Sequence, residues 1–357
     1  MLKKVLVGMS GGVDSSVAAA LLIEQGYQVG GVTLCLFTPE GNDEQDELAL
    51  AGREARRVCE ELGIEHRVCD FRQQFKEQVI ERFALLYAKG RTPNPCIDCN
   101  RYIKFRLLYQ KAQTLGYNYI ATGHYAQIEY CANQNRYLLK KAAYAAKDQS
   151  YVLYTLPQQI LSATLFPLGG FSKEEARQFA AMRGLAVAKK PDSQDICFVP
   201  DGDYAAFLAR LPGHAAAPGN FIDKTGRILG RHRGLVHYTI GQRKGLKLSF
   251  GAPRYVTGID EIANTVTLGE AEELFGHKLV ADDVNFISCE QLSDTLDVTV
   301  KTRYKQQETP ATIRPLANGR VQVCFQYPQR ALTPGQAVVF YSGDIVVGGG
   351  TIITSLD

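Results

Sequence analysis

The chain has 357 residues, which is enough for two or three domains with buried cores. Its composition is ordinarily globular, with 45% hydrophobic and 22% charged residues, and the formal net charge is only +3. This balance permits a nucleic-acid partner without arguing for one, since a local basic patch matters more than the total charge. No apolar run approaches the length of a membrane span, and we expect no signal peptide, because residues 1–4 lead directly into the first predicted strand.

The nine cysteines show no regular spacing. An odd number of cysteines in an untargeted chain is typical of reduced thiols rather than of a disulfide framework. We therefore expect a cytoplasmic protein without membrane contact.

A strand, a glycine loop and a helix open the chain. Residues 3–8 predict a buried β-strand, and residues 14–25 predict a helix. Two glycines allow a sharp turn and a close approach to a ligand, and the free N–H groups of the helix start attract an anion. An ordinary glycine turn is the alternative. The loop reads Ser10-Gly11-Gly12-Val13-Asp14-Ser15.

Two better-known phosphate loops do not fit this stretch. A Walker A loop needs a lysine after its last glycine, and none follows Gly12. A dinucleotide fingerprint needs G-x-G-x-x-G, which Gly8, Gly11 and Gly12 do not supply. The loop instead resembles the pyrophosphate-binding loop (PP-loop) of N-type ATP pyrophosphatases, which adenylate a substrate and release pyrophosphate.

The next elements predict an α/β fold. Residues 28–36 and 65–71 read as strands, and residues 48–62 and 74–87 read as helices. The order βαβαβα is typical of an open parallel sheet with helices on both faces. Ligands of such sheets lie outside the carboxyl ends of the strands, where the glycine loop is expected.

Residues 90–105 contain two prolines and a Cys-x-x-Cys pair. The prolines predict a rigid loop over residues 92–96, followed by a helix from about residue 100 to 115. Cys99 is then expected near a helix N-terminus beside Arg101 and Lys104, which lowers a thiol pKa. The spacing of Cys96 and Cys99 alone fits a redox pair, half of a metal site or two unrelated thiols.

Two polar clusters follow. Residues 117–121 predict a strand ending at Gly123 and His124, a histidine that fits either a phosphate or base contact or a buried structural role. Residues 127–141 predict a β-hairpin, and the cluster at residues 147–151 predicts the start of a helix, with capping as its plain interpretation. Residues 173–183 predict a further helix.

Cys197 follows two lysines and a proline in a predicted loop, which favours an exposed thiol, although a buried cysteine is the alternative. Basic and aromatic residues cluster over residues 231–247, which indicates either a phosphate-backbone surface or a solvated charged face. Short alternating strands from residue 281 onward predict a small β-barrel or sandwich that binds rather than catalyses.

Taken together, these motifs resemble the bacterial tRNA-specific 2-thiouridylases over essentially the full chain. The resemblance implies three domains, namely a PP-loop catalytic domain (1–202), a small central domain (203–277) and a C-terminal β-barrel (278–357). The matching stretches are residues 8–16, 90–105, 121–125, 147–151, 192–198, 238–245, 333–336 and 348–350.

The resemblance also implies a reaction. ATP, with Mg²⁺, adenylates the C2 oxygen of the wobble uridine of a tRNA. Cys197 carries a persulfide received from a sulfur donor or relay protein, and Cys99 is the nucleophile that works with it. Sulfur release gives 2-thiouridine and leaves a Cys99–Cys197 disulfide, which thiol exchange reduces. A monomer is expected.

The resemblance assigns further site residues position by position. The ATP site comprises Gly8, Met9, Ser10, Gly11, Gly12, Val13, Asp14, Ser15, Leu34 and Gly123. The loop that meets the target base comprises Asn94, Pro95 and Cys96. The positions that contact tRNA comprise His124, Lys147, Asp148, Gln149, Arg303, Tyr304 and Gln336.

Cys96 departs from family members that carry Asp at this position. An Asp there serves as a base or base contact, whereas a thiol is a weaker hydrogen-bonding partner. The departure raises the hypothesis that Cys96, Cys99 and Cys197 hold an iron–sulfur cluster.

Two rival functions remain at this point. A different PP-loop ligase, such as an amidotransferase-linked synthetase, has no use for Cys99 and Cys197. An RNA-binding protein with a decayed nucleotide fold does not require the intact loop at residues 10–15.

Overall fold

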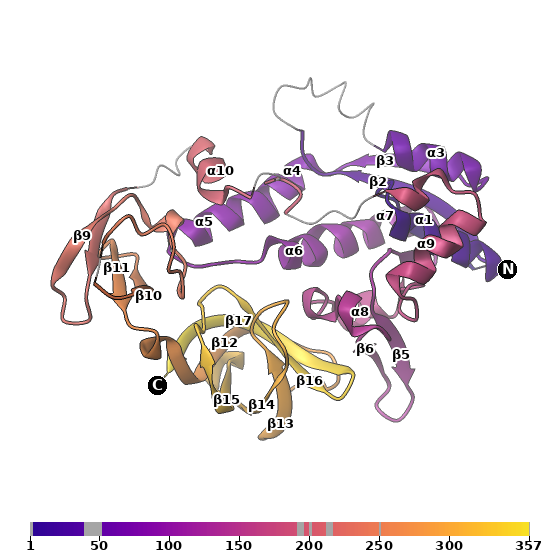
Figure 1. Ribbon diagram of the computed structural model, residues 1–357. Helices are drawn as coiled ribbons and strands as arrows, with labels where there is room; N and C mark the ends of the chain where they lie inside the picture. The colour runs from indigo at the N-terminus through magenta and orange to yellow at the C-terminus, as the bar shows by residue number, and fades with distance from the viewer. Residues whose placement is uncertain are drawn as a thin grey trace.

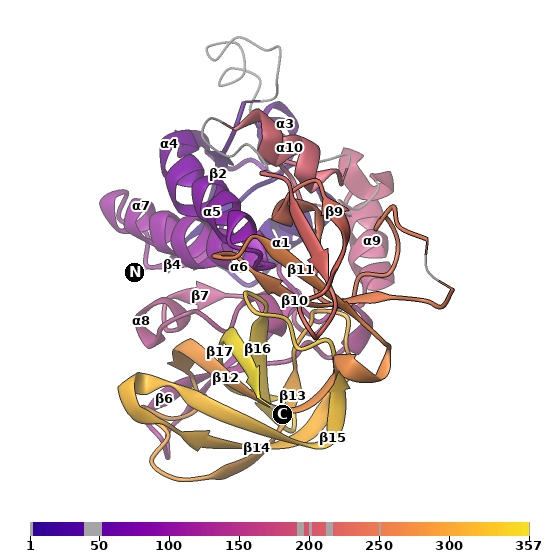
Figure 2. The same ribbon diagram turned by 90° about the vertical axis from the view of Figure 1, so that its left-hand side faces the viewer.

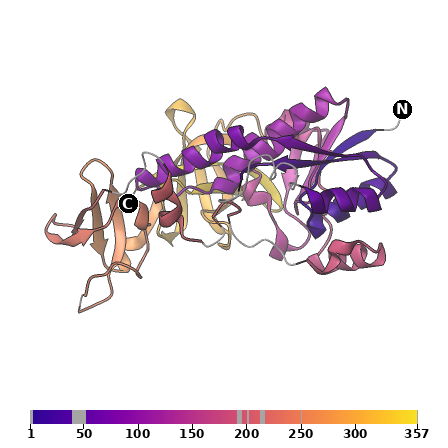
Figure 3. The same cartoon turned by 90° about the horizontal axis from the view of Figure 1, so that it is seen from above.

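The computed structural model describes residues 3–38, 52–190, 196–199, 202–211, 217–249 and 251–356. A parallel sheet, a small mixed sheet and a closed antiparallel barrel follow one another along the chain (Figure 1). Seen from above, the parallel sheet and the mixed sheet lie at opposite ends of the molecule (Figure 3). None of the described helices combines the length and the apolar character that crossing a membrane requires.

The N-terminal sheet confirms the predicted α/β class. Its five strands run parallel in the order β3-β2-β1-β4-β7. The chain leaves β1 toward β2 on one side and later adds β4 on the other, so the crevice between their carboxyl ends is the topological switch point. The strands are β1 (Lys4–Gly8), β2 (Gln28–Cys35), β3 (His66–Asp70), β4 (Tyr119–Ala121) and β7 (Thr164–Leu165).

Helices cover both faces of this sheet. Val5 and Val7 of β1 pack in one apolar cluster with residues of α1, α3 and α9, while Leu6 packs in another with Leu108 and Ala112 of α7. Burial of both faces explains the continuous apolar run in β1. The helices are α1 (Val13–Glu24), α3 (Arg53–Glu61), α7 (Leu108–Thr114) and α9 (Lys173–Met182).

The helix that carries Cys99 begins earlier than the sequence analysis predicts. It runs without a break through α6 (Pro95–Asp98), π-helical η2 (Cys99–Leu107) and α7. Asn94 caps it, because its side-chain oxygen accepts a hydrogen bond from the Cys96 N–H at 3.1 Å. Proline at the first helical position is favourable, since its missing N–H has no partner there. Pro95 and Cys96 are therefore helical rather than part of the predicted loop, and Cys99 lies in the second turn.

The predicted third helix is also a composite. It consists of α4 (Arg72–Phe75), π-helical η1 (Lys76–Glu81) and α5 (Arg82–Ala88). The predicted hairpin is confirmed as β5 (Gln127–Cys131) and β6 (Arg136–Lys140). The cluster at residues 147–151 opens no long helix and forms two short 3₁₀ turns, η3 (Ala145–Lys147) and η4 (Ser150–Val152). Two further short helices are α8 (Gln158–Leu161) and α10 (Tyr204–Arg210).

The mixed sheet has the strand order β10-β11-β8-β9, in which β11 and β8 are parallel. Phe221, Tyr238 and Val256 lie in its small core. The strands are β8 (Gly219–Ile222), β9 (Ile228–His232), β10 (Tyr255–Asp260) and β11 (Thr265–Gly269).

The C-terminal barrel closes through the pairing of β12 with β17, which confirms the predicted barrel. The β5–β6 hairpin extends the barrel sheet, since Ile345 of β17 pairs with Lys140 of β6. The barrel therefore lies against the first part of the chain (Figure 2). Its strands are β12 (Phe275–Phe286), β13 (Leu296–Lys301), β14 (Thr309–Pro315), β15 (Val321–Arg330), β16 (Ala337–Ser342) and β17 (Ile345–Leu356).

Candidate functional site

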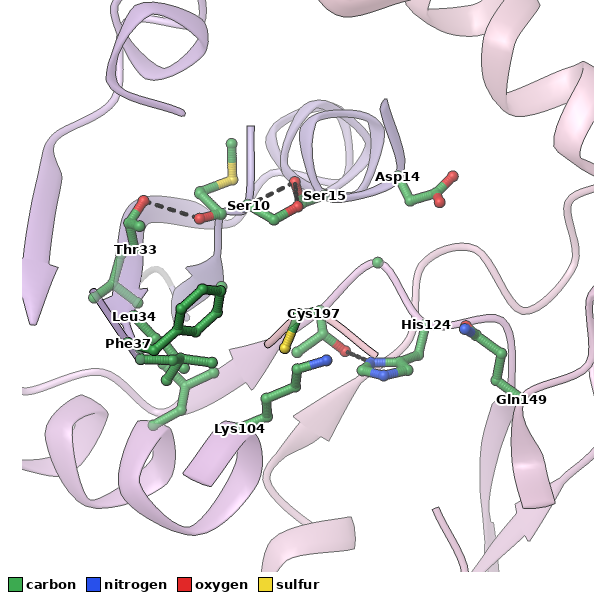
Figure 4. A pocket seen from close by; sticks show the side chains of 17 residues that line it. Ser10, Asp14, Ser15, Thr33, Leu34, Phe37, Lys104, His124, Gln149 and Cys197 are labelled. Atoms are coloured by element: carbon green, nitrogen blue, oxygen red, sulfur yellow. Dashed lines mark hydrogen bonds between the residues drawn. The ribbon is translucent and has the colours of Figure 1, made fainter. Parts of the chain in front are cut away.

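A cavity of about 510 Å³ opens at the carboxyl ends of the parallel strands, where the sheet topology predicts a ligand. It joins the glycine loop, the ends of β2 and β4, and the Cys99 helix (Figure 4). Its wall is formed by Gly8, Met9, Ser10, Asp14, Ser15, Val32, Thr33, Leu34, Leu36, Phe37, Lys104, Leu108, Thr122, Gly123, His124, Gln149 and Cys197.

The glycine loop is fixed by its own backbone and by its neighbours. Gly11 has φ of +69°, and a Cβ atom there would lie 2.9 Å from the Cβ of Glu54, so both conformation and space favour glycine. Gly12 is the N-cap of α1. The Ser15 hydroxyl accepts a hydrogen bond from the Ser10 N–H at 3.2 Å and donates one to the Gly12 carbonyl at 3.2 Å. The loop therefore presents hydroxyls and a helix start to the cavity, which suits an anion.

Most of the predicted ATP-site residues meet at this cavity. Gly8, Met9, Ser10, Asp14, Ser15, Leu34 and Gly123 line it, whereas Gly11, Gly12 and Val13 belong to the loop and the start of α1 but do not line the cavity. Gly123 is required by packing: a Cβ atom there would lie 2.6 Å from the Asp14 carbonyl carbon and 2.7 Å from the Ser15 nitrogen. The backbone at Gly123 therefore closely approaches the start of α1.

The sequence analysis missed several lining residues. Thr33 donates a hydrogen bond of 2.9 Å to the Met9 carbonyl, which ties the end of β2 to the loop. Leu36 and Phe37 add apolar wall next to Leu34. Their position after a buried strand that neighbours β1 was the available signal.

His124 is a neutral imidazole on the cavity wall. Burial, reinforced by the charge of Lys104, lowers the pKa of His124 to about 3. One ring nitrogen, Nδ1, lies 2.8 Å from the Thr122 hydroxyl. His124 therefore offers hydrogen bonding to a ligand at neutral pH, and no positive charge.

The two predicted catalytic cysteines are close enough for their charges to interact, although they differ in access. Cys197 is exposed and lines the cavity, as predicted, while Cys99 is only 6% exposed. The expectation of a low pKa for Cys99 is wrong for this conformation. Burial, with smaller contributions from the nearby thiols of Cys197 and Cys96, raises the pKa of Cys99 to about 12. Burial also raises the pKa values of Cys197 and Cys96.

One of the two expected cations does face the thiols. Lys104 lowers the pKa of each of the three cysteines, and its side chain reaches into the cavity beside Cys197 and His124 (Figure 4). Arg101 instead forms a bidentate ion pair with Asp283 of the barrel. Lys104 is thus the cation that the three thiols share.

All nine cysteines are free thiols. Across the described ranges, no group of three or more His, Cys, Asp or Glu side chains is placed to hold a metal ion. In the described conformation, Cys96, Cys99 and Cys197 therefore do not form a metal site. Of the motif at residues 192–198, positions 192–195 lie outside the described residues.

The predicted tRNA-contacting residues divide between the cavity wall and the barrel. Gln149 lines the cavity and accepts a hydrogen bond of 2.9 Å from the Tyr125 N–H. The Asp148 carboxylate accepts hydrogen bonds from the Ala142 N–H and from the N–H and hydroxyl of Ser150, which is a local structural role, but Asp148 is not the N-cap of a helix. Lys147 ends the 3₁₀ turn beside them.

Barrel residues complete this side of the site. The Tyr304 hydroxyl donates a hydrogen bond of 3.2 Å to the Asp148 carbonyl. The Gln336 amide donates one of 2.7 Å to the Thr92 carbonyl, and the Arg303 guanidinium donates one of 3.1 Å to the Ala331 carbonyl. The fold therefore joins Tyr304 to Asp148 across 156 positions, and Gln336 to Thr92, just before the Cys99 helix, across 244 positions.

Only some of the side chains in the basic stretch at residues 231–247 lie on the surface. His232 is 2% exposed and its Nδ1 accepts a hydrogen bond from the Gly234 N–H, while Tyr238 is also buried. These aromatic rings belong to the core of the mixed sheet. The cations of this stretch remain exposed, namely Arg231, Arg233, Arg243, Lys244 and Lys247.

Comparison with known proteins gives a consistent assignment along the chain. Residues 3–201 match the family described as tRNA methyl transferase HUP domain. Residues 205–270 match the tRNA methyl transferase PRC-barrel domain, and residues 276–352 match the aminomethyltransferase β-barrel domain.

Curated relatives align over nearly their whole length. The tRNA-specific 2-thiouridylase MnmA of Acetivibrio thermocellus is 52% identical, covering 98% of this chain and 99% of the relative. That of Lachnoclostridium phytofermentans is 50% identical, covering 99% and 100%. That of Clostridioides difficile is 49% identical, covering 100% and 99%. The chain belongs to the family of the tRNA-specific 2-thiouridylases.

Proposed function

We propose that the protein is a tRNA 2-thiouridylase that adenylates the C2 oxygen of a wobble uridine with ATP and then replaces that oxygen with sulfur. The proposal is carried by one observation: a single cavity is lined by residues for both half-reactions. Ser10 and Ser15 of the phosphate loop and the exposed thiol of Cys197 face the same space. The name of the curated relatives supports the substrate and the product.

The first half-reaction is the adenylation, and the glycine loop at residues 10–15 suits it. The C2 oxygen of uracil is a poor leaving group, and its attack on the α-phosphorus of ATP turns it into part of AMP while pyrophosphate departs. Backbone N–H groups at the start of α1, with Ser10 and Ser15, stabilise the phosphate charge that shifts during this step.

Mg²⁺ would accompany ATP and offset the charge of the departing pyrophosphate. The residues present fit a metal held mainly through phosphate oxygens and water. Asp14, the carboxylate that lines the cavity, is already bound by Lys173 and Tyr125, so phosphate oxygens and water rather than Asp14 would hold the metal. This arrangement resembles the usual way in which Mg²⁺ is bound with nucleotides, through few protein ligands.

The second half-reaction uses the two thiols. The terminal sulfur of a Cys197 persulfide bonds to C2, and AMP leaves with the former oxygen. The Cys99 thiolate then attacks Sγ of Cys197, the sulfur–sulfur bond breaks, and its electron pair stays on the sulfur of 2-thiouridine. A Cys99–Cys197 disulfide remains, and an external thiol supplies the two electrons that reduce it.

Cys99 must lose its proton and reach Cys197 for this step. With a pKa of about 12 and 6% exposure, it is a buried thiol in the described conformation. We therefore place a rearrangement of the Cys99 helix between tRNA binding and sulfur transfer. The start of this helix, with Asn94, Pro95 and Cys96, is where the target base would arrive.

The remaining features of the proposal concern partners and organisation. The tRNA would contact the first domain and the barrel, since His124, Lys147, Asp148, Gln149, Arg303, Tyr304 and Gln336 come from both. A separate protein would deliver the persulfide sulfur to Cys197. We propose a cytoplasmic monomer with domains at residues 1–202, 203–277 and 278–357. The three sheets support this division in outline, but the β5–β6 hairpin joins the barrel sheet and β12 begins at Phe275.

A second candidate uses the same substrates with different sulfur chemistry. Cys96, Cys99 and Cys197 influence one another's pKa values, so modest movements would let them share an iron–sulfur cluster. The residues as described do not form a metal site, and we derive no step through a cluster. A fully active, iron-free preparation would exclude this candidate.

The test is formation of 2-thiouridine on unmodified tRNA, with ATP, Mg²⁺ and a persulfide donor. The proposal predicts thiolated tRNA together with equal amounts of AMP and pyrophosphate, and none of these products when tRNA is omitted. Pyrophosphate release with tRNA but without thiolation would point to another PP-loop ligase. Binding of tRNA without any ATP cleavage would indicate an RNA-binding protein instead.

A further inference from the structure

The phosphate loop carries no cation, and it does carry a carboxylate. Between residues 8 and 16 the charged side chain is that of Asp14, which lines the cavity. The triphosphate of ATP is strongly anionic, so a bare carboxylate beside it would weaken binding by like-charge repulsion. A phosphate site of this kind needs a compensating positive charge from elsewhere in the fold.

Lys173 supplies a positive charge at this point. Its Nζ lies 2.7 Å from Oδ1 and 2.9 Å from Oδ2 of Asp14, and the Tyr125 hydroxyl donates a further bond of 2.7 Å to Oδ1. The Lys173 side chain is 16% exposed and that of Asp14 is 34% exposed. The pair is therefore more shielded from solvent than ordinary surface ion pairs, whose effect is small.

The position of Lys173 in its own helix is unfavourable. It is the first residue of α9, where the positive end of the helix dipole disfavours a cation. The neighbouring residues follow the favourable pattern, because Ser172 caps the helix and Glu174 and Glu175 occupy its first turn. Local helix stability therefore does not explain a lysine here, and such exceptions mark functional positions.

We propose that Lys173 is a positioning residue of the ATP site, which offsets the charge of Asp14 and holds that carboxylate clear of the β and γ phosphates. Figure 4 shows the Asp14 carboxylate directed away from Lys104 and Cys197. This inference rests on the use of ATP in the proposed function. It adds to the site a residue 159 positions from the loop.

The test compares ATP with AMP, which has the same nucleoside and α phosphate and lacks the β and γ phosphates. Equilibrium binding of each nucleotide to the full chain is measured without tRNA. Lys173→Met should weaken ATP binding by about tenfold or more and change AMP binding by less than about twofold. Lys173→Arg should retain most of the ATP affinity, since it keeps the charge.

Two further variants separate charge compensation from a general structural effect. Asp14→Asn combined with Lys173→Met should recover part of the lost ATP affinity, because the uncompensated carboxylate is gone. Lys140→Met is the matched control, since Lys140 pairs with Glu129 and Asp344 outside the cavity. Lys173→Gln replaces Lys173→Met if the latter does not fold.

Equal weakening of ATP and AMP, or unchanged ATP binding in both neutral variants of Lys173, would overturn the inference. So would a double variant that binds ATP no better than Lys173→Met. If the wild-type protein binds no ATP, the proposed function itself fails. If the wild type binds ATP and the Lys173 variants bind it equally well, this inference alone fails.

Discussion

Gln336 of the barrel donates a hydrogen bond of 2.7 Å to the backbone carbonyl of Thr92, 244 residues earlier in the chain. The Thr92 N–H completes the junction by donating to the Pro334 carbonyl at 3.0 Å. Gly335 allows this approach, because a Cβ atom there would lie 2.8 Å from the Thr92 nitrogen. The barrel thus fixes the segment that leads into Asn94, Pro95 and the Cys99 helix.

Removing the Gln336 amide should loosen this segment. Gln336→Leu keeps the size and loses the donor, so we expect faster amide exchange at residues 90–94 and a loss of about 0.5–1.5 kcal/mol in the free energy of unfolding. Hydrogen–deuterium exchange resolved by peptide measures the first effect. Gln113→Leu is the control, because Gln113 is exposed and bonds only locally to Tyr109. Unchanged exchange at residues 90–94 would contradict this role.

Alkylation of Cys99 should depend steeply on pH. Burial raises the pKa of Cys99 to about 12, so at pH 8 about one thiol in ten thousand is ionised. Because the thiolate is the reactive form, the iodoacetamide rate at Cys99 should rise about tenfold per pH unit from pH 7 to 10, without a plateau. Mass spectrometry of the Cys99 peptide follows the rate. A plateau near pH 8 would show an ordinary or activated thiol instead.

Lys104 should matter for sulfur transfer through its charge. It lowers the pKa values of Cys96, Cys99 and Cys197, so Lys104→Met should slow iodoacetamide modification of all three thiols. Single-turnover thiolation should slow by about tenfold or more, while Lys104→Arg should stay near wild type. If the methionine and arginine variants were equally slow, shape rather than charge would be the cause.

Asp98 makes the stability of the fold depend on pH. Burial raises its pKa from 3.8 to about 6, even though Arg82 lies 3.2 Å away and opposes the shift. A raised carboxyl pKa means that the folded state favours the neutral form, so wild-type stability falls as pH rises from about 4 to 6. A shift of about two units corresponds to about 3 kcal/mol at most.

Asp98→Asn should remove this dependence. The free energy of unfolding of the variant minus that of the wild type should increase by up to about 3 kcal/mol between pH 4 and pH 7. Denaturant unfolding at several pH values measures it. Asp70→Asn is the control of opposite sign, since Arg72 lowers the pKa of Asp70 and its stabilisation is lost as pH falls. A constant difference for Asp98→Asn would show that Asp98 is not buried in this way.

Much of the fold and of the site could be predicted from local sequence patterns. The strand, glycine loop and helix at residues 4–24 follow from apolar periodicity and two glycines within one short stretch, and the structure confirms them. The start of the Cys99 helix was misplaced, although Asn94 followed by Pro95 is a helix-start signal of the same local kind. The error arose because the two prolines predict extended backbone over residues 92–96.

Contacts between distant segments could not be predicted. Lys173 reaches Asp14, and Arg101 pairs with Asp283, across 159 and 182 positions respectively. The low pKa expected for Cys99 was based on a nearby helix N-terminus and on the charges of Arg101 and Lys104. Burial in a cluster with Phe75 and Phe198, which only tertiary packing brings to Cys99, reverses that expectation.

Thiolation of unmodified tRNA by the cysteine variants tests the central claim most directly. With ATP, Mg²⁺ and a persulfide donor, Cys99→Ser and Cys197→Ser should form no 2-thiouridine, while Cys96→Ser remains active. Loss of activity in all three variants, in step with iron content, would favour the cluster chemistry. Thiolation that survives the loss of both Cys99 and Cys197 would contradict the catalytic assignment.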